Sequence, residues 1–122
     1  MCGIAGLYAP RTVTPKIANM DAMLGSIVHR GPDGEGRYST DDRRYQAGFR
    51  RLAIIDLDSG DQPIIDQRTG RVLSGNGEIY NYLELRKSHS EYPYQTHGDM
   101  ESVLALHAAR GETFYEGLNG MF

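Results

Sequence analysis

Glycine is unusually frequent in this chain, which predicts a fold rich in loops or β-strands. Fifteen of the 122 residues are glycine, and glycine weakens the interior of helices and strands while favouring turns. The hydrophobic pattern along the chain changes from strand-like to helical and back. These patterns predict an α+β domain of short elements with a mainly antiparallel sheet, and they argue against a βαβ repeat.

Local patterns place the first elements. Residues 3–8 (GIAGLY) are short and apolar, which predicts a buried strand. Residues 15–28 carry apolar side chains at helical spacing, after a start signal in Thr14-Pro15. Residues 29–36 (HRGPDGEG) are rich in glycine with a proline, so we expect a loop there.

The second part of the chain alternates again between strand and helix patterns. We expect two strands within 46–57, separated by a bend near Arg50-Arg51, a turn at 58–61 and a further strand at 71–74. We also expect helices at 80–87 and 99–110 and one further helical turn at 113–118. Gly111 directly after the second helix is a stop signal.

Charge and cysteine content exclude several classes of function. Thirteen basic and sixteen acidic residues leave a net charge of −3, so no basic field favours nucleic acid or an anionic membrane. Cys2 is the single cysteine, which excludes an intrachain disulfide framework. The N-terminal residues lack the features of a signal peptide, and no apolar run approaches transmembrane length. We therefore expect a cytoplasmic protein with no nucleic-acid or membrane partner.

Cys2 is the first candidate for chemistry. If Met1 is removed, the thiol and a free α-amine lie on the same residue, and the amine can act as the base for its own thiol. This arrangement activates a nucleophile without a histidine partner. The alternative is a small, buried and inert cysteine.

Asn76-Gly77 is the second candidate. An asparagine amide and the following glycine N–H can both donate to an oxyanion formed during attack on an amide. The alternative is a hairpin turn, since Asn-Gly is a strong turn signal.

Arg51 and Asp99 could recognise the two charged ends of a free amino acid. Arg51 lies in an otherwise apolar strand pattern, where it is either a carboxylate clamp or an edge residue that extends to water. Asp99 opens a helix, where it is either a cap or a partner for a substrate ammonium.

Two other kinds of site are disfavoured. The loop at 29–36 lacks the spacing and the lysine of a phosphate-binding loop. The four histidines show no metal-ligand spacing, and a structural zinc site is improbable with one cysteine. We therefore expect no metal in this chain.

Taken together, these residues resemble the class II glutamine amidotransferase domain, in particular that of glutamine-hydrolysing asparagine synthetases. The matching segments run in the family's order along the whole chain: MCGIAG (1–6), HRGPD (29–33), RRLAIIDL (50–57), GDQPI (60–64), NGEIYNY (76–82) with ELR (84–86), Thr96, Asp99 and Glu101, and LNGMF (118–122). The chain departs from the usual family pattern at Phe49, at Ser74-Gly75 and at Gly98.

The resemblance implies a fold, a reaction and a set of site residues. The fold is that of the N-terminal nucleophile (Ntn) hydrolases, a four-layer αββα sandwich with antiparallel sheets, here truncated at the C-terminus. The reaction is hydrolysis of glutamine to glutamate and ammonia. The implied roles are nucleophile for Cys2, oxyanion donors for Asn76 and Gly77, α-carboxylate and α-ammonium partners for Arg51 and Asp99, and substrate-pocket walls for Leu52, Ile54 and Glu78.

The resemblance also implies partners beyond these residues. We expect residues 1–122 to be the N-terminal portion of a glutaminase domain, with the synthetase domain absent. That domain would take up the ammonia and use ATP and magnesium to make asparagine from aspartate, and a homodimer is one candidate assembly of the full-length protein. Two alternatives stay open: a catalytically inactive module that binds partners, and an amidotransferase for another acceptor.

Overall fold

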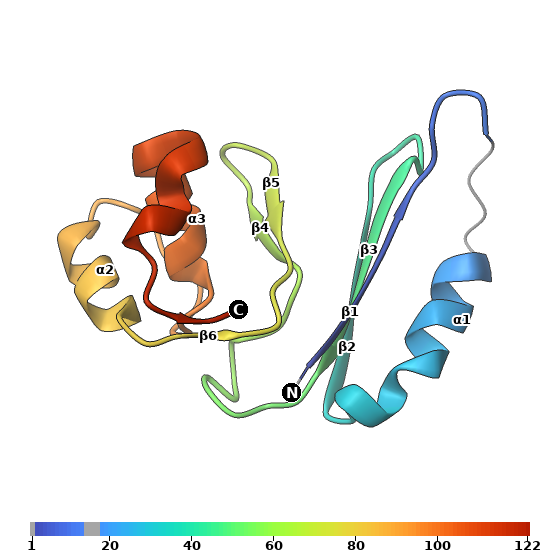
Figure 1. The fold of residues 1–122 in the computed structure, drawn as a ribbon, viewed down its shortest axis with the longest axis horizontal. Coiled ribbons are helices and arrows are strands. Elements are labelled where there is room, and N and C mark those ends of the chain that lie inside the picture. The colour runs from blue at the N-terminus through green and yellow to red at the C-terminus, as the bar shows by residue number, and fades with distance from the viewer. Residues whose placement is uncertain (1, 14–17) are drawn as a thin grey trace.

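The computed structural model describes residues 2–13 and 18–122, and it arranges them in four layers. Figure 1 shows helix α1 (Ala18–Ser26) on one side of a three-stranded sheet, and the hairpin of β4 (Ile64–Asp66) and β5 (Arg71–Leu73) on the other. Beyond the hairpin lie α2 (Tyr82–Ser88) and α3 (Glu101–Arg110). The chain is therefore α+β with an αββα layering, as expected.

The three-stranded sheet is antiparallel and contains β1 (Gly3–Tyr8), β3 (Tyr45–Arg51) and β2 (Gly34–Ser39), in the order β1-β3-β2. The strand expected at 3–8 is confirmed. The loop expected at 29–36 is wrong beyond residue 33, because β2 begins at Gly34; a short 3-10 helix covers Val28–Arg30. The glycines of β2 made this segment look like a loop in the sequence. They let the backbone of Gln62 pack closely against the strand, because a Cβ on Gly36 would overlap it.

The two faces of the sheet have different neighbours. Side chains alternate along a strand, and a Cβ on Gly48 would meet Met20 and Leu24 of α1. Gly48 therefore lies on the face that α1 covers. Phe49 and Arg51, on the opposite face of β3, point toward the hairpin layer. The helix expected at 15–28 is observed at Ala18–Ser26, and its proposed start at Thr14-Pro15 lies outside the described residues.

A separate core lies between the hairpin and the helices. Ile64 of β4, Leu85 of α2, and Val103, Leu104 and Leu106 of α3 are all buried in it. Both expected helices are confirmed with small shifts, since α2 starts at Tyr82 and α3 at Glu101. Gly111 ends α3 with a positive φ of 60°, which glycine adopts readily.

Several short elements complete the fold. The strand expected at 71–74 is β5, and the extra turn is a 3-10 helix at Gly111–Gly117. The second strand expected within 46–57 is wrong, because the chain leaves the sheet after Arg51 and runs as a loop. The sequence patterns missed β4, β6 (Glu78–Ile79) and β7 (Gly120–Met121); the last two pair antiparallel. Among the described residues, no helix is long and apolar enough to cross a membrane.

Candidate functional site

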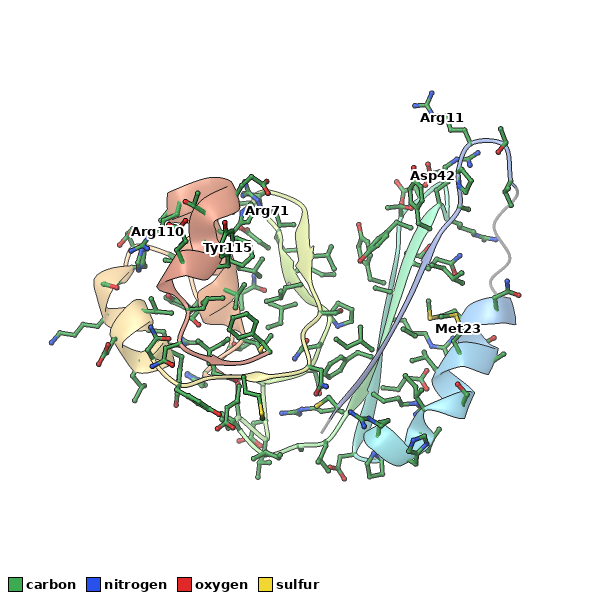
Figure 2. All side chains as sticks on the ribbon, in the orientation of Figure 1. Arg11, Met23, Asp42, Arg71, Arg110 and Tyr115 are labelled. Carbon is green, nitrogen blue, oxygen red and sulfur yellow. The ribbon has the colours of Figure 1, made fainter. Side chains whose placement is uncertain are left out.

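One cavity gathers the residues that the sequence singled out. Its walls come from the start of the chain, the end of β3 and the loop after it, residues 75–78, residues 96–100 and Met121. Its volume is about 120 Å³, small against the roughly 300–1,000 Å³ of drug-sized pockets, so it suits a small metabolite. All eight candidate residues line it: Cys2, Arg51, Leu52, Ile54, Asn76, Gly77, Glu78 and Asp99. Figure 2 shows side chains of the sheet and of the hairpin layer extending toward one another between these layers.

Cys2 is placed by the sheet. It precedes β1, whose Gly3 pairs with Arg50 of β3, so the thiol lies beside the end of β3. The Leu52 N–H donates to the Cys2 Sγ at 3.3 Å, and the thiol lies 3.6 Å from the Leu52 carbonyl oxygen. Cys2 is only partly buried and faces the cavity. This position is unlike that of an inert core cysteine.

Asn76-Gly77 forms no hairpin turn. The segment joins β5 to β6, and these strands pair with β4 and β7 rather than with each other. The Gly75 N–H donates to Gln62 Oε1 at 2.7 Å, which fixes the segment from the side. A Cβ on Gly77 would overlap the backbone of Met121 and Phe122, so the close packing of the C-terminal strand requires glycine there. Within the described residues, the Asn76 side-chain amide makes no hydrogen bond and is available to a ligand at the cavity.

Arg51 is buried and does not extend to water. Only 8% of it is exposed, and its guanidinium turns into the loop that follows β3. Nη1 donates to the Leu57 carbonyl at 3.2 Å and to Asp61 Oδ1 at 3.0 Å. Nη2 donates to the carbonyls of Ile55, at 3.3 Å, and Asp56. The arginine therefore holds a loop and one carboxylate, that of Asp61, at the edge of the cavity.

Asp99 is buried as well, with 6% exposed, and it does not cap α3 with its side chain. Its Oδ2 instead accepts the N–H of Ile79 in β6 at 2.7 Å. This bond fixes the carboxylate on the wall opposite the sheet. Arg51 and Asp99 thus supply a buried positive and a buried negative group to one cavity from different layers of the fold.

Leu52, Ile54 and Glu78 form more open parts of the wall. Ile54 is 70% exposed, which places it at the mouth of the cavity. Leu52 and Glu78 are half-buried. Glu78 belongs to β6, next to Asn76-Gly77, and pairs with Met121 of β7.

The structure adds lining residues that sequence reasoning did not name as site residues. Phe49, Ile64 and Met100 are buried and give the cavity an apolar floor. Thr96 and Gly98 belong to the segment before α3 that carries Asp99. Phe49 and Gly98 carried a signal in the sequence, since each departs from the usual family pattern, whereas the apolar floor is visible only once the layers are assembled.

The segment before α3 is held by two charged side chains, Glu101 and Arg86. Glu101 is fully buried and accepts the N–H groups of Gln95, at 2.8 Å, and Thr96, at 2.7 Å, and the Thr96 hydroxyl at 2.8 Å. Arg86 donates to the carbonyls of Thr96 and Gly98 at 2.7 and 2.8 Å. These bonds satisfy backbone groups of an irregular segment, which gives Asp99 a rigid support.

Metal-binding geometry is not found in the described part of the chain, where no group of three or more His, Cys, Asp or Glu side chains could hold an ion. The absence of a metal from the reaction stays a prediction.

Comparison with known proteins places the chain in a family. The family model described as "Glutamine amidotransferase domain" matches residues 1–122. Among similar proteins are asparagine synthetase B [glutamine-hydrolyzing] of Escherichia coli K12, 37% identical over 100% of this chain and 22% of that protein, and asparagine synthetase [glutamine-hydrolyzing] 2 of Bacillus subtilis, 39% identical over 100% of this chain and 16% of that protein. A relative from Brassica oleracea, an asparagine synthetase [glutamine-hydrolyzing], is 42% identical over 100% of this chain and 21% of that protein. The chain thus spans about a fifth of the length of these relatives.

Proposed function

Because this chain belongs to the glutamine amidotransferase domain family, we propose that it forms the glutaminase site of an asparagine synthetase and hydrolyses glutamine to glutamate and ammonia. The observation that carries the proposal is the cavity: a thiol, free amide donors and two buried, oppositely charged side chains line one space. An amino acid with a side-chain amide presents the complementary groups.

Cys2 acts as the nucleophile in this proposal. After removal of Met1, the free α-amine takes the thiol proton, and the thiolate attacks the amide carbon of glutamine. The oxyanion of the tetrahedral intermediate accepts hydrogen bonds from the Asn76 amide and the Gly77 N–H. The C–N bond then breaks, ammonia leaves with the proton, and a γ-glutamyl thioester stays on Cys2. Water hydrolyses this thioester to glutamate and restores the thiol.

Arg51 and Asp99 hold the other end of glutamine. Arg51 binds the α-carboxylate, for which the carboxylate of Asp61 has to give way. Asp99 uses the carboxylate oxygen that does not bind Ile79 to hold the α-ammonium. Leu52, Ile54 and Glu78 form the cavity walls between Cys2 and the Arg51–Asp99 pair. The cavity therefore selects a ligand by the distance between its charged end and its side-chain amide.

The names of the relatives state asparagine synthesis with glutamine hydrolysis, and this supports a proposal for the fate of the ammonia. We propose that ammonia passes to a synthetase domain beyond these residues, where ATP and magnesium activate aspartate, and that the reaction takes place in the cytoplasm. A homodimer is the assembly proposed for the full-length protein.

The direct test of the glutaminase proposal is product analysis. The full-length protein should release glutamate and ammonia in equal amounts from glutamine without ATP, and Cys2→Ala should abolish both. If Cys2→Ala releases glutamate at the wild-type rate, the proposed nucleophile is wrong. If the wild type releases none, the alternative of an inactive binding module replaces the proposal.

A further inference from the structure

The two charged walls of the cavity are joined at one residue, Asp56, that is not among the expected site residues. Arg51 lies at the end of β3, and Asp99 lies two residues before the start of α3. The loop after β3, residues 52–61, meets the segment 95–99 directly. Asp56 lies at this meeting point and is half-buried.

The Asp56 carboxylate binds the segment that leads to Asp99. Oδ2 accepts the His97 N–H at 2.9 Å and the Ser59 hydroxyl at 2.6 Å, and Oδ1 accepts the Ser59 N–H at 3.0 Å. Burial alone opposes ionisation of this group. The hydrogen bonds from Ser59 and from the backbone of His97 and Gly98 outweigh that effect and hold the pKa of Asp56 below its ordinary value. The carboxylate is therefore ionised where it holds the segment.

The backbone of Asp56 binds the other wall. Its carbonyl oxygen accepts hydrogen bonds from Arg51 Nη2 and from the Gly60 N–H, the latter at 3.0 Å. Asp56 adopts a positive φ of 52°, a conformation that asparagine and aspartate tolerate better than other residues with a side chain. This turn lets the carbonyl face Arg51 while the carboxylate faces His97.

We propose that Asp56 is a positioning residue that sets the spacing between Arg51 and Asp99, and so the fit of the α-carboxylate and α-ammonium of the substrate. The inference rests on the proposed glutaminase function. Asp56 touches no reacting atom, since its hydrogen bonds go to the Arg51 guanidinium, to Ser59 and Gly60 of its own loop, and to the His97 backbone N–H. Cys2 and Asn76 are held by other contacts, to Leu52 and through Gly75 to Gln62. Loss of Asp56 should therefore weaken substrate binding more than the chemical step.

The variants Asp56→Ala and Asp56→Asn separate the two functions of the residue. Alanine removes every side-chain acceptor. Asparagine keeps the positive φ and one oxygen, so it can accept from His97 or from the Ser59 N–H but not from both. Asp58→Asn is the matched control, because Asp58 is an exposed residue of the same loop and loses the same charge.

Steady-state kinetics on the full-length protein give the first result. In Asp56→Ala we expect the KM for glutamine to rise about tenfold to thirtyfold, the lower part of the range for losing hydrogen bonds to a charged group, while kcat changes less than threefold. Asp56→Asn should show a smaller rise, and Asp58→Asn should match the wild type. An unchanged KM in folded Asp56→Ala would overturn the proposal.

The rate at which iodoacetamide alkylates Cys2 gives the second result. This reagent has no α-amino or α-carboxylate group, so its rate reports the nucleophile without Arg51 or Asp99. We expect the same rate in Asp56→Ala as in the wild type. A parallel loss of kcat, alkylation rate and melting temperature would show a merely structural residue and overturn the proposal.

Failure of the proposed function would be recognised separately. A wild-type protein without glutaminase activity refutes that function and, with it, the role in substrate fit. Amide hydrogen exchange then tests whether the Asp56 carboxylate holds the His97 N–H. This N–H should exchange faster in Asp56→Ala than in Asp58→Asn, and equal rates would show that Asp56 does not hold the segment.

Discussion

At the scale of single residues, Arg51 already binds a carboxylate of its own chain. Asp61 pairs with it at 3.0 Å although the Asp61 side chain is 82% exposed and that of Arg51 only 9%. The sequence showed that Arg51 suits a carboxylate, but nothing in the local pattern showed that Asp61, ten residues later, reaches it. Such a pair is set by the path of the loop and not by spacing along a strand.

Asp61 should therefore compete with the substrate. An exposed carboxylate adds little stability to its partner, about 0–1 kcal/mol, so removing it should cost the fold little. In Asp61→Asn we expect the KM for glutamine to fall, by up to about fivefold, with kcat unchanged. Titration of the glutaminase rate with glutamine checks this, with Asp58→Asn as control, and a raised KM would show that Asp61 instead helps Arg51 to hold the substrate.

At the scale of elements, the segment before α3 depends on Glu101 for its shape. The helix itself was predictable from its apolar periodicity and its glycine stop. The bonds of Glu101 to Gln95 and Thr96 were not, because an acidic residue in the first turn of a helix reads as an ordinary surface position. Full burial of this carboxylate shows that its function is to hold backbone groups.

Glu101→Gln should consequently destabilise the protein. The amide that replaces one carboxylate oxygen is a donor, and it would face backbone N–H groups that are donors too. We expect a loss of about 2–3 kcal/mol in the free energy of unfolding, the usual cost of leaving a buried donor without its hydrogen-bond acceptor. Urea unfolding measures it, and Glu112→Gln, at an exposed position after α3, should change stability by less than about 0.5 kcal/mol. Equal stability of both variants would contradict this reading of Glu101.

At the scale of the whole molecule, the layers were more predictable than their short connections. The periodic segments that became β1, α2 and α3 have enough residues to show a pattern, whereas β6 and β7 have two each and β2 contains two glycines. The joint placement of the eight site residues came from the family resemblance, since no local pattern links Cys2 to Asp99. The connection between Arg51 and Asp99 through Asp56 depends on a hydrogen bond between residues 41 positions apart. A pattern within one segment cannot predict such a contact.

Stability of the whole fold should fall at alkaline pH because of Tyr92. Burial, followed by the negative charges of Asp66 and Glu101, raises the pKa of Tyr92 to about 12 from 10.0. The folded state therefore keeps a proton that the unfolded state loses, and stability declines as the pH rises from about 10 to about 12. Denaturant unfolding across this range measures the decline.

Tyr92→Phe should reduce that decline. The Tyr92 hydroxyl is buried without a hydrogen-bond partner among the described residues. Because an unpaired buried polar group costs free energy, its removal should raise the free energy of unfolding by about 1 kcal/mol at neutral pH. A variant less stable than the wild type at neutral pH would mean that the hydroxyl makes a stabilising hydrogen bond in the folded state.

For glutaminase activity, Cys2 must be a processed, N-terminal nucleophile in a pocket that accepts glutamine. The most direct measurement is the intact mass of the protein before and after reaction with 6-diazo-5-oxo-norleucine, a glutamine-like electrophile. We expect loss of the Met1 mass and a single adduct on Cys2, slowed by excess glutamine. Met1 retained, or Met1 removed with no adduct at Cys2, would contradict the proposed function.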